Sequence, residues 1–169
     1  MRNGYATRTT IALGLFLAAC ASSNTSVVDS WKDPTVPVRN YRKILAVFMT
    51  SDTNTRRSAE DALARKIGGA VASYTVVPDS ILRDARRAKE WVKRDGFDAA
   101  VLMRPFPVGK EMNYVARTGG YTVPAGYRST WEYWDAGWGY AYNAAHYAPD
   151  EVVYIETNVY SLTDDKLAW

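Results

Sequence analysis

The side chains that could do chemistry in this chain are few, and they lie at two places. Cys20 is the only cysteine and His146 the only histidine, and Asp150 and Glu151 follow His146 closely. A single cysteine excludes an intrachain disulfide and any zinc site built on paired cysteines. His146 with the two acids could contact a metal ion or serve a Ser-His-Asp site, but no Gly-x-Ser-x-Gly turn exists to expose a serine nucleophile. The sequence therefore predicts no catalytic residues, no metal site and no cofactor.

Cys20 ends a segment that has the three parts of a secretory signal. Two arginines precede it without an acid, residues 11–19 form a short apolar run, and small residues come just before the cysteine. A transmembrane helix needs roughly 20 apolar residues, about twice the length of this run. The tetrapeptide Leu17-Ala18-Ala19-Cys20 resembles the bacterial lipobox. We therefore expect residues 1–19 to be a lipoprotein signal peptide and Cys20 to be lipidated. The alternative is an ordinary signal peptide with a chance cysteine.

A lipid on Cys20 makes a membrane the first expected partner, since several acyl chains together hold a protein firmly. Ala21 directly follows Cys20, at the position where an Asp retains lipoproteins in the inner membrane of enteric bacteria. This favours an outer-membrane anchor, with the domain facing the periplasm. Residues 20–42 are then the lipidated cysteine and a tether, because residues 21–26 are small and polar and two prolines keep residues 31–37 extended. Trp31 is expected to pin this arm to the domain.

The charge of the chain argues against a nucleic-acid partner. The net charge is +3, and two of these charges precede Cys20, which leaves +1 after cleavage. Basic residues nevertheless gather on one predicted helix. They are either a patch for anionic lipid or cell-wall polymer, or a solvated helix face. They are Arg83, Arg86, Arg87, Lys89, Lys93 and Arg94.

The elements of the first half are predicted from apolar periodicity. Residues 43–49 and 98–106 read as buried strands, and residues 75–77 as a brief extended piece. Helices are expected over residues 55–71 and about 80–94, with Gly96 ending the second. The expected buried face of the first helix consists of Ala59, Leu63, Ile67 and Ala70 or Val71.

The C-terminal part predicts a long strand and a hairpin. Residues 151–162 alternate between two faces, one of them more polar, residues 163–166 form a turn, and residues 167–169 begin a partner strand. Residues 43–169 are therefore predicted to form one α/β domain, with α+β as the alternative. The domain would have a small mixed sheet with two helices packed on it and a C-terminal β-hairpin.

Residues 107–150 are predicted to be a long, aromatic, glycine-rich loop, because they show no sustained period. Aromatic rings with a polar edge can stack on sugars or lie at a membrane interface. The alternative is that these rings pack on the sheet or that the loop is disordered. The candidate binding residues are Tyr121, Tyr127, Trp131, Tyr133, Trp134, Trp138 and Tyr140.

Several short segments together resemble a group of uncharacterised bacterial lipoproteins, the family known as domain of unknown function 4136. They are SWKDP at residues 30–34, KILAVFM at 43–49, Arg57 and Glu60, GFDAAVLMR at 96–104, and ETNVYSLTDDKLAW at 156–169. The resemblance implies an α/β domain, a hairpin around the DDK turn and a helix after it. This chain ends at Trp169, so that helix is not part of the sequence. The family supplies no established activity or catalytic residues.

Three functions remain open on the sequence alone. The leading hypothesis is a non-enzymatic envelope lipoprotein that binds or scaffolds another envelope protein or a glycan. The second is a glycan-processing enzyme or other hydrolase that uses acids and His146. The third is a purely structural envelope protein in which the aromatic segment covers the core.

Overall fold

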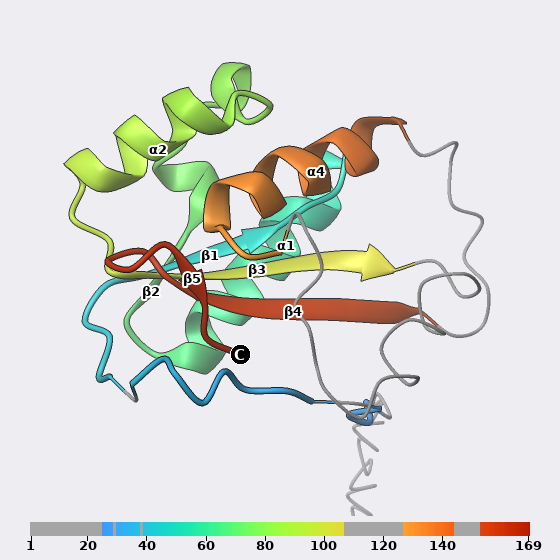
Figure 1. Cartoon of the computed structure of the whole chain (residues 1–169). Helices are drawn as coiled ribbons and strands as arrows, with labels where there is room; N and C mark the ends of the chain where they lie inside the picture. Colours follow the sequence, from blue (N-terminus) through green and yellow to red (C-terminus); the bar gives the residue numbers. More distant parts are fainter. Residues whose placement is uncertain (1–24, 29, 38, 107–126, 144–152) are drawn as a thin grey trace, which may run out of the picture.

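A mixed five-stranded sheet organises the molecule (Figure 1). The computed structural model describes residues 25–28, 30–37, 39–106, 127–143 and 153–169. The strand order is β2-β1-β3-β4-β5. The strands are β1 (Ile44–Phe48), β2 (Ala70–Ala72), β3 (Ala99–Phe106), β4 (Tyr154–Ser161) and β5 (Lys166–Leu167).

The sheet combines a parallel half with an antiparallel half. β1 pairs in parallel with both β2 and β3, whereas β4 pairs antiparallel with β3 and with β5. Parallel neighbours need crossover connections, and helices make the connections between β1, β2 and β3. The predicted α/β class, the mixed sheet and the C-terminal hairpin are confirmed.

The first helix, α1, spans Thr53–Ile67. The side chain of Asp52 caps it by accepting a hydrogen bond from the backbone N–H of Thr55 at 2.7 Å. The prediction that the helix continues to residue 71 is wrong. Gly68 and Gly69 have φ values of 67° and 83°, which end the helix and turn the chain into β2.

The buried face of α1 also differs from the prediction. Arg56 and Glu60 are the buried residues of this helix, while Ala59, Leu63 and Ile67 are only partly buried. The physical reason is that Glu60 accepts hydrogen bonds from backbone groups at the end of β1 and after β2. Satisfying these donors places a charged side chain inside, where a periodicity argument expects an apolar one.

The segment between β2 and the second helix contains turns. Residues 75–77 are not extended as predicted, because the N–H groups of Val76 and Val77 both donate to the carbonyl of Ser73. Short 3-10 helices, η1 (Ser73–Thr75) and η2 (Asp79–Ile81), fill this segment.

The second helix, α2, spans Ala85–Arg94 and thus begins later than the predicted residue 80. The carboxylate of Asp84 accepts from the N–H of Arg87 at 3.0 Å and fixes the start. Its predicted end is confirmed, with Gly96 in a left-handed conformation at φ 74°.

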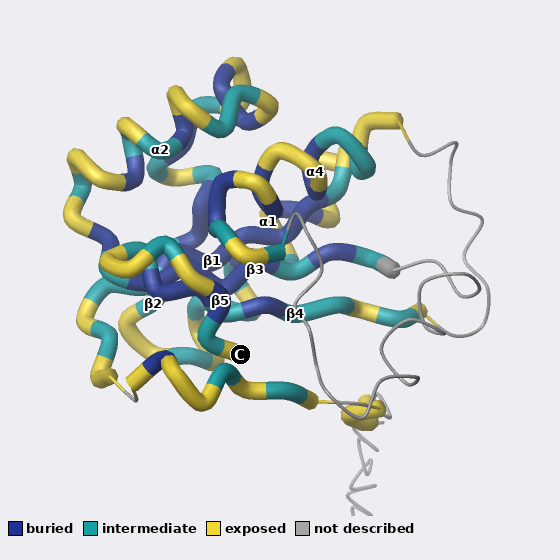
Figure 2. Tube along the Cα trace, viewed as in Figure 1, coloured by how far each residue is buried: buried dark blue, intermediate teal, exposed yellow. Residues whose placement is uncertain are grey.

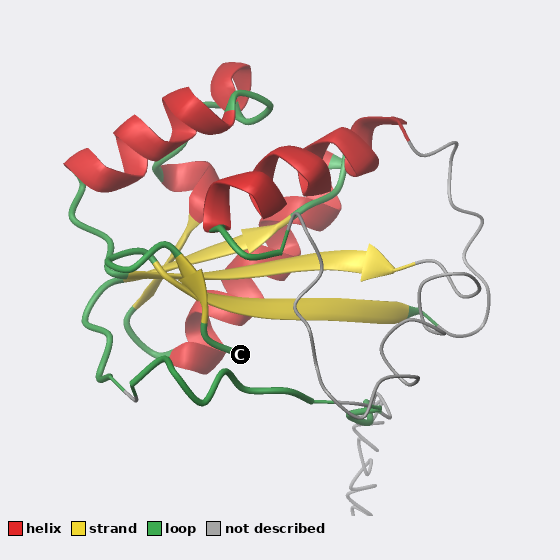
Figure 3. Ribbon diagram, in the orientation of Figure 1, coloured by secondary structure: helices red, strands yellow, loops and turns green. Residues whose placement is uncertain are grey.

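The third helix, α4 (Thr130–Asn143), corrects the predicted aromatic loop (Figure 3). Within residues 107–150 the structure describes residues 127–143, and most of them are helical. Within the described residues, three α-helices therefore accompany the sheet, and not the two that the sequence predicted. In Figure 1, α1 lies behind the sheet, while α2 and α4 lie in front of it.

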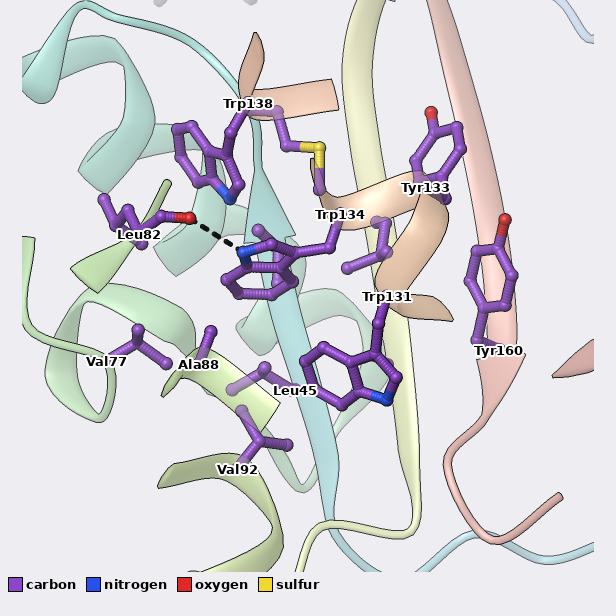
Figure 4. Close-up of a cluster of buried hydrophobic side chains, with 14 of the residues drawn as sticks. Leu45, Val77, Leu82, Ala88, Val92, Trp131, Tyr133, Trp134, Trp138 and Tyr160 are labelled. Atoms are coloured by element: carbon purple, nitrogen blue, oxygen red, sulfur yellow. Dashed lines mark hydrogen bonds between the residues drawn. The ribbon is translucent and has the colours of Figure 1, made fainter. Parts of the chain in front are cut away.

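The core lies between the sheet and the two front helices (Figures 2 and 4). Trp134 and Trp138 of α4 have no exposed surface, and Tyr133 is 1% exposed. They pack with Leu45 of β1 and with residues of α2 and η2. The indole N–H of Trp134 donates to the carbonyl of Leu82 at 2.8 Å, the bond drawn in Figure 4.

The arm before β1 is attached to the C-terminal edge of the sheet. The N–H of Asp33 donates to the carbonyl of Ala168 at 3.1 Å. Trp31 is partly buried against the core, as predicted, and Val36 is buried. The part of the arm from Trp31 to Val36 is therefore attached to the folded domain.

Candidate functional site

Two clusters of buried charge lie near the ends of β1 and β3. These strands are parallel neighbours, but the helices that follow them, α1 and α4, lie on opposite sides of the sheet (Figure 1). In open α/β sheets, ligands bind outside the carboxyl ends of strands at such a switch point. This rule comes from fold alone, so the chemistry of each cluster decides what it can do.

The first cluster, called the Arg104 cluster, consists of Arg104, Glu156, Tyr127 and Tyr133. Arg104 and Glu156 are directly paired residues of β3 and β4. The Arg104 Nε donates to the Glu156 carboxylate at 2.6 Å, and the two groups form an ion pair. The Tyr133 hydroxyl accepts from Nε at 3.0 Å and donates to the same carboxylate oxygen at 2.9 Å. The hydroxyls of Tyr127, just before α4, and Tyr133, in α4, thus converge on the pair formed by Arg104 and Glu156.

Aromatic rings enclose the Arg104 guanidinium. It lies 6.0 Å from the ring centroid of Tyr127, 5.5 Å from that of Tyr133 and 5.4 Å from that of Tyr140. The Tyr127 hydroxyl also accepts from Nη2 at 2.7 Å. Hydrogen bonds to a charged group and contacts with ring faces both stabilise the cation in a water-poor environment.

Burial and nearby charges determine the protonation states of Tyr133 and Arg104 in this cluster. Burial raises the pKa of Tyr133 well above its usual value, and the nearby Glu156 carboxylate raises it further. Burial alone lowers the pKa of Arg104, but Tyr133 and Glu156 outweigh it and raise that pKa. Tyr133 therefore stays a neutral donor and Arg104 stays charged. This arrangement is better suited to holding α4 on the β3–β4 pair than to transferring protons near neutral pH.

The second cluster is built around Glu60. Its carboxylate accepts from the Phe48 N–H at 3.1 Å, the Ser73 hydroxyl at 2.7 Å and the Tyr74 N–H at 2.9 Å. Burial raises the pKa of Glu60, although these hydrogen bonds oppose the shift. Arg56 lies 3.6 Å away and also pairs with Asp79 of η2 at 3.0 Å. Glu60 thus joins α1 to the ends of β1 and β2.

The predicted binding residues are separated by the fold. Trp131, Tyr133, Trp134 and Trp138 lie in the core, where a ring without exposed surface cannot stack on a ligand. Tyr127 and Tyr140 are partly buried beside Arg104. Tyr121 lies outside the described residues. Among the described candidates, only Tyr127 and Tyr140 therefore keep exposed surface for binding, and Tyr121 stays a prediction.

The other predicted residues of chemical interest also lie outside the described part of the chain. They are Cys20, His146, Asp150 and Glu151. The hydrolase hypothesis, which needs His146, stays a prediction. Among the described residues, no group of three or more His, Cys, Asp or Glu could hold a metal ion.

Sequence reasoning missed the Arg104 cluster, although a signal was present. Arg104 is the only charged residue of β3, and Glu156 is the only charged residue of β4. Opposite charges on two strands that pair antiparallel are expected to meet on one face. The sequence does not give the register between β3 and β4, and it is this register that aligns Arg104 with Glu156.

Comparisons with models of protein families, with curated proteins and with solved structures found no match. The resemblance to the lipoprotein family therefore stays a proposal. Within the described residues, no helix is long and apolar enough to cross a membrane.

Proposed function

We propose that this protein is a lipid-anchored component of the bacterial cell envelope whose α/β domain binds or scaffolds another envelope component. The anchor would be lipid on Cys20, and the outer membrane would be its site. The sequence before and after Cys20 supports the anchor. The observation that carries the scaffolding role is the attachment of the arm to the domain.

The arm limits how far the domain can move from its anchor. Ten residues lie between Cys20 and Trp31, so the Cα atoms of these two residues are at most about 40 Å apart when the chain is fully extended. At Trp31 the arm packs on the domain, and the Asp33–Ala168 hydrogen bond attaches it to the C-terminal edge of the sheet. The tether therefore always leaves the domain from this edge, which restricts how the domain can turn toward the membrane. A restricted orientation suits a protein that presents one surface to a partner.

Metabolic labelling with a fatty-acid analogue tests the anchor. We expect label on the wild-type chain and none on Cys20→Ala, with the variant lost from the membrane fraction. Equal labelling of both chains would remove the basis of the proposal.

Cross-linking in intact cells tests the scaffolding role. Wild-type protein should form a reproducible adduct with an envelope component, and Cys20→Ala should form less of it because the domain is no longer held at the membrane. Absence of an adduct with cross-linkers of different length and chemistry would contradict this role.

A second candidate, a purely structural envelope protein, is favoured by one observation. The rings that the sequence offered as a binding surface are largely core residues of α4, with Trp134 and Trp138 fully buried. On this view the aromatic segment stabilises the fold and has no ligand. The cross-linking experiment separates the two candidates, since a purely structural monomer forms no specific adduct.

A further inference from the structure

Helix α2 presents a cationic face on the side of the domain away from the arm. We propose that this face binds a carboxylate-rich polymer of the cell envelope, such as the peptide-bearing cell wall. The inference rests on the proposed function and names the chemistry of the partner. The α2 cationic face is defined as Arg83, Arg86, Arg87, Lys93 and Arg94, with Lys89 at its margin.

The face is produced by a strict division of α2 into two sides. Ala88 and Val92 have no exposed surface and pack in the core. The five residues of the α2 cationic face are all exposed, four of them on the helix and Arg83 just before its N-cap, and Lys89 is intermediate. Helical periodicity therefore collects the cations on one surface and the apolar groups on the other.

The charge of this segment is large relative to the rest of the chain. Residues 83–94 contain six cations and the two acids Asp84 and Glu90, a net charge of +4. The chain after cleavage before Cys20 carries +1, so its remaining residues together carry −3. A separation of charge of this kind concentrates positive potential over one face and attracts anions to it.

Neighbouring acids compensate only part of this charge. Lys89 pairs with Asp165 at 3.5 Å, and Arg94 pairs with Asp95 at 3.2 Å. The carboxylate of Asp84 caps the helix. Among the described residues, Arg86, Arg87 and Lys93 have no ion pair, although Glu90 lies on the same face.

Aromatic rings hold several of the cations in place. The Arg94 guanidinium lies 3.9 Å from the ring centroid of Trp91, and the Arg83 guanidinium lies 5.1 Å from that of Tyr142. The Lys89 ammonium lies 5.7 Å from the Trp131 ring. A cation that is already ordered loses less conformational entropy when it binds an anion. This order distinguishes the face from a set of freely moving surface charges.

The position of the face favours a partner other than the anchoring bilayer. In Figures 1 and 2, α2 lies at the top of the view and the arm at the bottom, with the sheet between them. A membrane reached through the arm therefore lies on the opposite side of the domain. The α2 cationic face then points into the periplasm, where the cell wall offers many carboxylates on one polymer. Multiple weak ion pairs to one polymer add up to stable binding.

Co-sedimentation of the full-length, detergent-solubilised protein with purified cell-wall sacculi tests the proposal. Wild type should sediment at low salt and be released at high salt. The variant Arg86→Glu/Arg87→Glu/Lys93→Glu should bind at least about tenfold more weakly, because three attractive charges become repulsive. Sacculi whose carboxylates have been amidated should retain little wild-type protein.

The matched control reverses three exposed cations on α1, behind the sheet, in Arg57→Glu/Arg65→Glu/Lys66→Glu. Both variants change the net charge equally, and circular dichroism and melting of each variant establish that it is folded before its binding is compared. The proposal is overturned if both variants lose binding equally, or if wild type binds amidated sacculi as well as untreated ones. It is also overturned if α2 reversal weakens binding only to nanodiscs of anionic lipid. Each of these results leaves fatty-acid labelling of Cys20 unaffected, so the anchor is judged separately.

Discussion

Gly137 is the residue of α4 that allows this helix to approach the sheet closely. It is buried, and a Cβ atom at this position would overlap the sulfur of Met49 in the loop after β1. We expect Gly137→Ala to lower the free energy of unfolding by about 1–3 kcal/mol, because the methyl group forces Met49 or the helix to move. Urea denaturation of wild type and variant measures the change.

Gly139, two residues further along the same helix, is the control. A Cβ there has no neighbour within 4 Å. Gly139→Ala should raise the free energy of unfolding by up to about 1 kcal/mol, since alanine is the better helix former. If both substitutions changed stability in the same direction by the same amount, close packing at Gly137 would not be the cause.

Glu60 should make the stability of the protein depend on pH. Burial raises its pKa in the folded state above the ordinary value of 4.5. Its favourable contribution is therefore fully present below pH 4.5 and is lost as the pH rises through the raised pKa. The difference in unfolding free energy between wild type and Glu60→Gln should fall as the pH rises from 4 to 8.

Asp98 provides a control, because its pKa is shifted in the opposite direction from that of Glu60. Burial raises its pKa, but hydrogen bonds from the N–H groups of Arg42 and Lys43 outweigh burial and lower the pKa below 3.8. The advantage of wild type over Asp98→Asn should therefore be present above pH 3.8 and decrease as the pH falls. Parallel pH profiles for the Glu60 and Asp98 pairs would contradict both assignments.

At the scale of elements, the Arg104 cluster joins α4 to the β3–β4 pair. The Tyr133 hydroxyl is the bridge, because it contacts both Arg104 and Glu156. Tyr133→Phe removes the bridge and leaves buried charged groups with fewer partners, so it should cost about 1–3 kcal/mol. Thermal denaturation, monitored by near-UV circular dichroism of the α4 tryptophans, measures the loss.

Tyr142→Phe on the same helix is the comparison, since Tyr142 is 43% exposed. Its effect should be within about 0.5 kcal/mol. Equal losses for the two substitutions would mean that the hydroxyl of Tyr133 does not hold α4 in place.

The position of α4 also explains where prediction from the sequence failed. More than half of its residues are tryptophan, tyrosine or glycine, which have modest or poor helix propensity, so neither composition nor polar contrast indicates a helix. The spacing nevertheless contained the signal. Trp131, Trp134 and Trp138 recur at intervals of three and four residues, and Gly137 lies on the same buried side.

The strands were easier to predict than the faces that they bury. Apolar runs located β1 and β3, and alternation located β4, because burial selects those patterns directly. Which face points inward depends on partners elsewhere. Glu156 and Asn158 of β4 lie on the face that meets α4, while Ile155 is 41% exposed. Arg104 on the neighbouring strand and the hydroxyls of Tyr127 and Tyr133 make the inward position of Glu156 favourable.

At the scale of the whole molecule, the arm and the α2 cationic face divide the domain into two sides. One side is attached to the tether, and the other carries the α2 cationic face, whose segment has a net charge of +4. The arrangement is useful only if the arm remains on the sheet while the protein is folded. The packing of Trp31 against the core is therefore the contact on which the orientation of the domain depends.

Trp31→Ala tests this dependence. Loss of a partly buried indole should lower the free energy of unfolding by about 1–2 kcal/mol. The arm should also become accessible to trypsin at Lys32, Arg39 and Arg42 while the sheet stays folded, since local release needs less free energy than global unfolding. Trp169→Ala, at a position 43% exposed, should leave the arm protected. If native trypsin cleavage were the same in all three proteins, Trp31 would not hold the arm. The domain could then rotate freely on its anchor, and the two sides would have no fixed relation to the membrane.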